Sequence, residues 1–509
     1  MPSTFQVYGA ALYKLYCQLE ARVVTPESDN HLTKLSASEA AKKIREGELS
    51  SYALVKAYFN RIRFVNGFIN AVAESFEAEA LEEARRVDDY IQKLDKASEE
   101  YKNLEITKPL LGVPVSVKSS FDVKGHRTIS GLTWRRNLPP VGDDAVAVER
   151  IRSAGGIPHC HTNVPDACLW IETFNKVFGT TSSPYDNRTT CGGSSGGEGA
   201  IISAEGSVIG IGTDIGGSVR MPAILNGIFS LKPVDDIPLD GHFPGGEGDD
   251  LHLMAGVGLL ARYAHDLAIF YSALSYIPIP DNYINLKPTK IYTVICISDE
   301  HNELSDVIRN AVPKVVNALG EKFEVEVEEL EIPKQNKIME WYFNEINDPK
   351  LGTFTGAVFP FDDNVNLIAE KLKSLVGIGQ VNPGTVECLQ MFNQPRGLQE
   401  YTRIHNELLE YRVKINQILS DDVLVVAPSL PRNHYFHREL LFTPRDFFLT
   451  GIFNVLALPA AIAPIGLDNQ GYPVTVQLAA KRGNDFLLTR TQEHIHDIFG
   501  GWKPPKDQL

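Results

Sequence analysis

Three serines stand in glycine-rich stretches of this sequence. Ser194 and Ser195 lie between two pairs of glycines in CGGSSGGEGA (residues 191–200), and Ser218 follows another glycine pair in GTDIGGSVR (residues 212–220). A serine hydroxyl is a weak nucleophile until a base removes its proton. Glycines let the backbone around such a serine approach a substrate closely. The pattern therefore raises two questions: which serine is the nucleophile, and which group takes its proton.

These stretches partly match several known glycine motifs. GGSSG at 192–196 fits G-x-S-x-G, the nucleophile elbow of α/β-hydrolases, but an elbow directly follows a buried strand. Residues 182–191 (SSPYDNRTTC) are polar and turn-forming, so we reject the elbow. GIGTDIG misses the dinucleotide pattern by one position, and no glycine loop ends in the Lys-Ser/Thr of a phosphate loop. A stretch rich in glycine and serine is usually a turn. That interpretation accounts for one such stretch, but poorly for two that lie within apolar sequence.

The order and spacing of several motifs resemble the amidase signature family. GVPVSVK (112–118), GGSSGGEGA (192–200) and GTDIGGSVRMPA (212–223) carry the resemblance, and TNVPD, FGTTSSPYDN, NGIFSLKP, LARYAHDL and IFNVLALPAAIAPIG extend it over about residues 35–500. Within this family, SVIGIGTDIGGSVRMPAILNGIF and the closing IFGGW are most similar to the fatty-acid amide hydrolases of the second type.

The resemblance implies a Ser-Ser-Lys triad. Ser218 would be the nucleophile, and Ser194 would relay its proton to a neutral Lys118. A lysine has a pKa of about 10.4 in water, so the pKa of Lys118 must fall by about three units, which burial after the apolar run VPVSV can supply. The same groups would return the proton to the departing amide nitrogen. As in the family, the relay is expected to use a cis peptide bond between Gly193 and Ser194.

The loop around the second glycine pair is expected to stabilise the reaction. Negative charge grows on the carbonyl oxygen during attack, and backbone N–H groups that converge on it form an oxyanion hole. The N–H groups predicted to do so are those of Ile215, Gly216, Gly217 and Ser218. We expect Asp214 and Arg220 to hold this loop as an ion pair, with two solvated side chains as the alternative. Ser195 would be a supporting hydrogen-bonding residue.

By the same resemblance, two further segments would line an apolar substrate cavity. One follows TNVPDA and consists of Cys168, Leu169 and Trp170, and the other holds Thr450 and Phe453. Large apolar residues belong more often to a core than to a binding site. These positions are therefore hypotheses about the pocket.

The sequence departs from the family pattern in three places. Ser119 stands where a glutamate commonly follows the catalytic lysine, which removes a carboxylate close to Lys118. Cys191 stands where proline is frequent. The type-two hydrolases usually have an N-terminal transmembrane helix, and this chain has the amphipathic segment 5–22 in its place.

Composition excludes several other classes of protein. The chain has 509 residues, 64 acidic against 49 basic and a net charge of −15, without a dense Lys/Arg cluster, so nucleic acid is not an expected partner. Six cysteines without a CxxC pair predict neither a zinc ribbon nor a disulfide framework. HCH at 159–161 and HIHD at 494–497 are interpreted as structural histidines in a strand and a helix rather than as a metal site.

The elements that must position these residues alternate between helix and strand. Segments 110–118, 145–163 and 472–480 contain predicted strands, whereas 35–66 and 76–104 are helical by pattern. This alternation predicts an α/β fold, and with the resemblance the amidase signature fold: a large mixed sheet covered by helices on both faces. We expect an N-terminal helix and link at 1–34, and one domain at 35–509 with a helical, least regular insertion at about 300–420.

The N-terminal stretch carries apolar residues on one helical face. Their spacing of three and four predicts a helix over 5–22 that docks on its own protein, with a membrane-surface anchor as the alternative. They are Phe5, Tyr8, Leu12, Leu15 and Leu19. No signal peptide or clear transmembrane helix is visible, which favours an intracellular protein, cytoplasmic or peripherally bound to a membrane.

The sequence therefore predicts a serine amidase that needs no metal or organic cofactor. Its substrate would be a small-molecule amide, and by resemblance a long-chain fatty-acid amide. The alternatives are a short-acyl or xenobiotic amidase or esterase, a glutamine-dependent amidotransferase subunit, and an inactive binding protein. The last would normally have lost Lys118, Ser194 or Ser218. A homodimer is compatible with the sequence.

Overall fold

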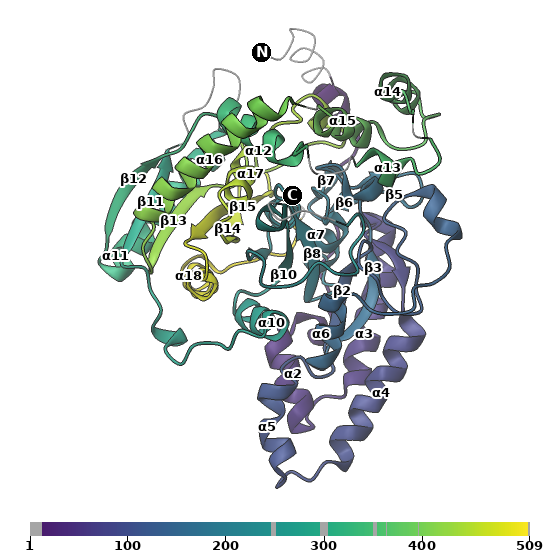
Figure 1. Cartoon of the computed structure of the whole chain (residues 1–509). Coiled ribbons are helices and arrows are strands. Elements are labelled where there is room, and N and C mark those ends of the chain that lie inside the picture. Colours follow the sequence, from purple (N-terminus) through teal and green to yellow (C-terminus); the bar gives the residue numbers. More distant parts are fainter. Residues whose placement is uncertain are drawn as a thin grey trace.

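One mixed sheet of 11 strands forms the centre of the molecule (Figure 1). The computed structural model describes residues 13–245, 251–295, 304–349, 354–362, 364–394 and 396–506. In pairing order the strands are β1 (Val72–Ser75), β3 (Ile157–Thr162), β2 (Pro114–Lys118), β8 (Ile209–Asp214), β10 (Gly256–Ala261), β9 (Phe229–Lys232), β14 (Ala460–Leu467), β15 (Pro473–Ala480), β13 (Val423–Pro428), β11 (Lys290–Ile295) and β12 (Glu326–Glu331). β2 is parallel to β3 and β8, β11 is parallel to β12 and β13, and the other pairs are antiparallel. The predicted mixed sheet is confirmed.

Helices cover both faces of this sheet, as predicted. Successive residues of a strand point to opposite faces: in β14, Ala460 and Ile462 join one apolar cluster, and Ala461 and Ala463 join the other. The first cluster is built mainly with α3 (Ser51–Ile69), α7 (Gly196–Ser203), α8 (Arg220–Asn226), α12 (Gln335–Ile346), α15 (Pro383–Phe392), α16 (Leu398–Ile418) and α17 (Phe448–Val455). The second is built mainly with α2 (Ala37–Glu46), α6 (Val146–Ser153), α10 (His265–Ser275), α11 (Asp306–Phe323) and α18 (Asp485–Phe499).

Smaller elements complete the fold. The remaining α-helices are α4 (Glu77–Lys93), α5 (Glu99–Thr107), α9 (Leu251–Met254), α13 (Thr355–Val358) and α14 (Leu367–Leu375). The 3-10 helices are η1 (His31–Lys34), η2 (Thr133–Asn137), η3 (Asp166–Cys168), η4 (Tyr283–Asn285) and η5 (Glu439–Leu441). Two small sheets pair β4 (Phe174–Asn175) with β5 (Gly179–Thr180) and β6 (Ser182–Ser183) with β7 (Asp186–Thr190). The segment expected to be turns before Cys191 thus contains two short strands, β6 and β7, but these form a sheet of their own.

The long helical pattern at 35–66 divides into α2 and α3. Ser36 begins α2, and its hydroxyl accepts from the Glu39 N–H at 3.1 Å, as a capping box requires. Gly47 ends α2 at a φ of 78°, a conformation that glycine adopts without strain. Figure 1 shows α3 and α4 side by side. The region 300–420 is largely helical, as expected, but it also supplies β12 at one edge of the main sheet.

The described part of the N-terminal helix differs from the prediction in the residue at which the helix ends and in the face that it buries. Residues 13–17 are helical, and Tyr13 and Cys17 turn inward: the Tyr13 ring lies 6.1 Å from that of Phe442, and Cys17 is buried. Leu15 and Leu19 of the expected stripe are 59% and 80% exposed. Phe5, Tyr8 and Leu12 lie outside the described residues, so membrane contact through this segment stays a prediction. Within the described part of the chain, no helix is both long and apolar enough to span a bilayer.

Candidate active site

Two neighbouring strands bring the predicted base and nucleophile to one edge of the sheet. β2 ends at Lys118, β8 ends at Asp214, and Ser218 lies in the loop between β8 and α8. Because β2 and β8 are adjacent and parallel, their carboxyl ends lie at the same edge, where α/β sheets commonly bind ligands.

The face on which Lys118 lies follows from the strand pattern. Val115 and Val117 point into one apolar cluster, so Lys118 points to the opposite face, against which α7 packs. Glycines in β8 let α7 approach closely. A Cβ atom at Gly212 would lie 2.5 Å from the Ser195 Oγ, which is closer than Cβ atoms come to non-bonded atoms in proteins. The glycines of GIGTD therefore serve the contact between β8 and the segment that carries Ser194 and Ser195.

Lys118 and Ser194 are in direct contact. Lys118 is fully buried, and its Nζ lies 2.8 Å from the Ser194 Oγ and 2.9 Å from the Thr213 Oγ1. Burial lowers the pKa of Lys118 below its ordinary value, although Cys168, Asp214 and Glu198 all favour the charged form. The peptide bond between Gly193 and Ser194 is cis, as predicted.

The two serine-bearing loops are joined by their backbones. The Ser195 N–H donates to the Ser218 carbonyl oxygen at 3.0 Å, and the Ser195 hydroxyl lies 3.5 Å from the Thr213 carbonyl oxygen. Ser195 thus joins the two loops, and its supporting role in the reaction stays a prediction. Ser218 is 9% exposed, and its side chain lines a pocket.

Asp214 and Arg220 form the predicted ion pair, and both side chains are fully buried. The Arg220 Nη2 lies 2.9 Å from the Asp214 Oδ1, and the Arg220 Nε lies 3.0 Å from the Oδ2. Burial alone would raise the pKa of Asp214, but the charge and hydrogen bonds of Arg220 hold it well below its usual range. Arg220 also donates to the Thr450 carbonyl oxygen and to Gln477, each at 2.8 Å. The pair therefore ties the loop between β8 and α8 to α17 and β15.

The four predicted oxyanion-hole amides are not equivalent. The Gly217 N–H donates to the Asp214 Oδ1 at 2.7 Å and is thus already engaged. The N–H groups of Ile215, Gly216 and Ser218 have no hydrogen bond to another described group. Gly217 has a φ of 126°, which only glycine adopts readily, and a Cβ there would lie 2.2 Å from the Thr450 Oγ1. Three of the four amides are thus free to receive an oxyanion.

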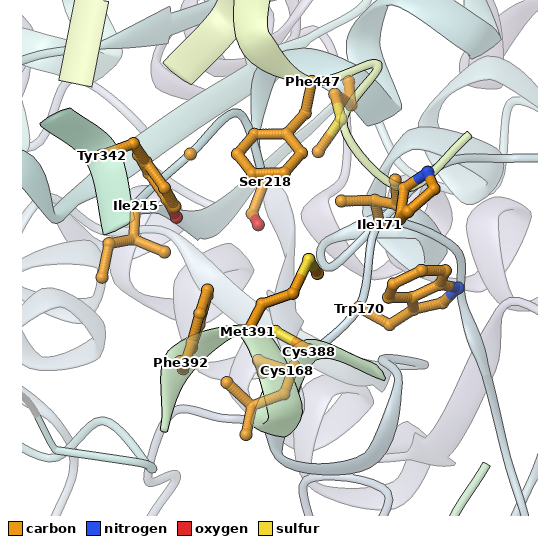
Figure 2. Close-up of a pocket in the computed structure, with 14 residues that line it drawn as sticks. Cys168, Trp170, Ile171, Ile215, Ser218, Tyr342, Cys388, Met391, Phe392 and Phe447 are labelled. Carbon is orange, nitrogen blue, oxygen red and sulfur yellow. The ribbon is translucent and has the colours of Figure 1, made fainter. Parts of the chain in front are cut away.

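A largely apolar pocket lies over Ser218 (Figure 2). Figure 2 shows the Ser218 hydroxyl directed into the cavity, with Met391 reaching toward it from α15. The lining residues are Cys168, Leu169, Trp170, Ile171, Ile215, Gly216, Ser218, Met221, Tyr342, Cys388, Met391, Phe392, Pro444 and Phe447.

The pocket contains part of the predicted lining. Cys168, Leu169 and Trp170 are present, whereas Thr450 and Phe453 are not among its residues. Thr450 instead donates its hydroxyl to the Gly216 carbonyl oxygen at 2.7 Å and so holds the loop from behind. Sequence analysis missed the helices α12 and α15, which supply Tyr342, Cys388, Met391 and Phe392. Nothing in the local sequence of these helices distinguishes apolar residues that line the pocket from apolar residues of the core.

A buried carboxyl group lies close to the lysine despite Ser119. Glu198 of α7 accepts from the Thr162 hydroxyl at 2.7 Å and is hydrogen-bonded to Ser116. Burial raises the pKa of Glu198 to about 8, against the hydrogen bonds and the charge of Lys118. Glu198 stands in the glycine-rich motif GGEGA, which could have drawn attention to it. Its position near Lys118, however, depends on the packing of α7 against β2, which the motif does not reveal.

The two histidine clusters lie in the predicted elements. His159 and His161 belong to β3, where the His159 Nε2 lies 3.3 Å from the Gly206 carbonyl oxygen and the His161 Nε2 lies 3.1 Å from that of Phe121. His494 and His496 belong to α18. Among the residues that the structure describes, no group of three His, Cys, Asp or Glu side chains is arranged to hold a metal ion.

Comparison with known proteins places the chain in a family. The family model for Amidase matches residues 53–489. Fatty-acid amide hydrolase 2-A of Danio rerio is 34% identical over 516 residues, covering 97% of this chain and 94% of that protein. Fatty-acid amide hydrolase 2 of Homo sapiens is 32% identical over 492 residues, covering 93% and 91%. A solved structure named fatty acid amide hydrolase has the same fold, with a TM-score of 0.74 at 23% identity over 97% of this chain and 89% of the other.

Proposed function

Since the chain belongs to the amidase family, we propose that it hydrolyses long-chain fatty-acid amides through a Ser-Ser-Lys triad. The protein is an amide hydrolase related to the fatty-acid amide hydrolases, and the amidase signature fold predicted from the sequence is confirmed. The observation that carries the proposed mechanism is the 2.8 Å contact between the buried Lys118 Nζ and the Ser194 Oγ. A lysine whose pKa is lowered by burial can serve as a base near neutral pH.

The first half of the proposed reaction forms an acyl-enzyme. The Ser218 Oγ attacks the amide carbonyl carbon and gives its proton to the Ser194 Oγ, while the Ser194 proton passes to the neutral Lys118 Nζ. The carbonyl electron pair moves to oxygen, where the free amides of the 215–218 loop stabilise it. The carbon–nitrogen bond then breaks, and the Lys118 proton returns through Ser194 to the leaving nitrogen.

The second half of the reaction releases the acid. Water attacks the acyl carbon and gives a proton to Lys118 through Ser194. The bond from the acyl carbon to the Ser218 Oγ breaks, and that proton returns to the Ser218 Oγ. The products are a carboxylic acid and an amine, and no step needs a metal or an organic cofactor.

The pocket supports an apolar acyl group. Aliphatic, aromatic and sulfur-containing side chains dominate its lining, including Met391, Phe392 and Phe447. Burying a methylene group from water yields about 0.8 kcal/mol at most, which is about a fourfold gain in kcat/KM for each added carbon. Short-acyl and xenobiotic amidases would share the triad, but their kcat/KM would not rise in this way with each added carbon. An amidotransferase subunit would need a partner, and an inactive binding protein would lack turnover.

A series of primary amides, from acetamide to C18 and C20 chains, tests the proposal. We expect kcat/KM for acid release to rise with chain length until the pocket is filled. Ser218→Ala should abolish turnover. Ser230→Ala is the matched control, because it removes a buried serine hydroxyl in β9 that has no hydrogen-bond partner among the described residues. A flat length profile would overturn the fatty-acid assignment alone, whereas full activity of Ser218→Ala would overturn the mechanism.

A further inference from the structure

A histidine outside the predicted triad is linked to Lys118 through Thr213. The Thr213 Oγ1 lies 2.9 Å from the Lys118 Nζ and 3.0 Å from the His242 Nε2. The other ring nitrogen, the His242 Nδ1, lies 3.0 Å from the Pro244 carbonyl oxygen. The chain therefore runs from the Pro244 backbone through His242 and Thr213 to Lys118.

The direction of each hydrogen bond follows from the chemistry of its atoms. A carbonyl oxygen can only accept, so the His242 Nδ1 carries the proton of this contact. A neutral imidazole has one N–H group, and the Nε2 is then an acceptor. The ring is neutral because burial, the largest of the causes, lowers the pKa of His242 well below its ordinary value. The Thr213 hydroxyl must therefore donate to His242, and its oxygen accepts from Lys118.

This arrangement determines which way the amine of Lys118 faces. One N–H donates to the Thr213 Oγ1, and a second is directed at the Thr213 carbonyl oxygen at 3.4 Å. The remaining tetrahedral position of the nitrogen faces the Ser194 Oγ at 2.8 Å. In a neutral amine that position is the lone pair, which is the site that accepts the relayed proton.

We propose that His242 is a positioning residue that directs the Thr213 hydroxyl away from Lys118 and so leaves the lysine lone pair to Ser194. The inference rests on the proposed function, because it gives Lys118 the role of base. Without His242, the Thr213 hydroxyl is free to rotate and donate to the Lys118 lone pair, in competition with Ser194. The other groups that act on the Lys118 charge are Cys168, Asp214 and Glu198, and none of them replaces the acceptor on Thr213.

His242→Ala and His242→Gln test this role on the full-length enzyme. We expect His242→Ala to lower kcat by about 10- to 100-fold with KM unchanged, a part of the 10²- to 10⁴-fold that general-base catalysis contributes. His242→Gln should recover most of the loss, because its amide can donate to Pro244 and accept from Thr213. His434→Ala is the matched control, since His434 stacks on Tyr472 at 3.9 Å between ring centroids and should leave kcat unchanged.

Two further readouts separate positioning from a structural effect. If His242 acts through Thr213, its removal in a Thr213→Ala background should change kcat less than twofold. The kcat/KM plateau of His242→Ala should also stay low at alkaline pH, because the lone pair is misdirected rather than protonated. Additive losses, recovery at high pH or no rescue by Gln would overturn the inference. Unchanged kcat in His242→Ala would overturn it as well. If Ser218→Ala is inactive in the same assay, the proposed mechanism stands and only the role of His242 is refuted.

Discussion

Gly212 should tolerate no side chain, because α7 packs directly on it. In Gly212→Ala, the new Cβ would lie 2.5 Å from the Ser195 Oγ, 2.9 Å from the Ser195 Cβ and 3.1 Å from the Val219 Cγ2. Ordinary contacts between non-bonded carbon atoms are about 3.5 to 4.0 Å. The segment that holds Ser194 and Ser195 must therefore move away from β8 by about 1 Å.

That displacement sets the size of the expected effect. The Lys118 Nζ and the Ser194 Oγ are 2.8 Å apart, and an added ångström breaks their hydrogen bond. A misplacement of about 1 Å can cost about 100-fold in rate. Overpacking a core also costs about 1 to 3 kcal/mol of stability. We expect Gly212→Ala to lower kcat/KM by about 100-fold and to unfold at a lower temperature.

The assay compares acid release and thermal unfolding for Gly212→Ala and Gly256→Ala. Gly256 is a matched control in the neighbouring strand β10, where a Cβ would meet the Pro233 carbonyl oxygen at 3.3 Å. We expect the control to keep kcat/KM within about threefold, since one oxygen can yield by a few tenths of an ångström. Wild-type activity in Gly212→Ala, or equal losses in both variants, would refute the reasoning.

Two further substitutions address the charges near the site. Asp214→Asn leaves Arg220 buried without its counter-charge and should reduce the free energy of unfolding by about 3 to 5 kcal/mol near neutral pH. Because the pKa of Asp214 is lowered in the folded state, this loss should shrink as the pH falls below about 4, and denaturant unfolding at several pH values checks it. A loss below about 1 kcal/mol at pH 7 would contradict this account. Glu198 has a pKa of about 8 in the folded state and about 4.3 when unfolded, so the wild type should lose stability as the pH rises between these values. Glu198→Gln should lack that loss and keep its activity at pH 7, and an equal pH slope in both proteins would show that Glu198 is ionised.

The contact between Lys118 and Ser194 was predictable because both residues stand in motifs that resemble the family. A glycine pair beside a serine indicates a tight backbone approach, but an apolar run that ends in lysine does not by itself indicate a buried amine, because a lysine at a strand end is ordinarily solvated. Lys118, Ser194 and the cis bond at Gly193 could therefore be placed through the family resemblance. The ion pair of Asp214 and Arg220 also spans few residues, and it forms as expected.

The rest depends on segments that are distant in sequence. Met391 and Phe392 of α15 reach the pocket of Ser218 because the chain folds back across the sheet, and nothing in their own helix distinguishes them from core residues. Thr450 is expected to line the cavity, but its hydroxyl donates to the Gly216 carbonyl oxygen instead of facing the cavity. His242 carries no motif, because its link to Lys118 runs through another side chain.

The charges around Lys118 determine how strongly burial can lower its pKa. Arg220 lies 2.9 Å from Asp214 and compensates its charge, so Asp214 stabilises the charged form of Lys118 only weakly. Glu198 would favour the charged lysine if it were ionised, but burial raises its pKa to about 8. In the protonated form it can donate to Ser116, which in turn can donate to the Ile209 carbonyl oxygen at 3.3 Å. Every hydroxyl in that network then has a partner without an ionised carboxylate, which leaves Cys168 as the main group that opposes the lowering of the Lys118 pKa by burial.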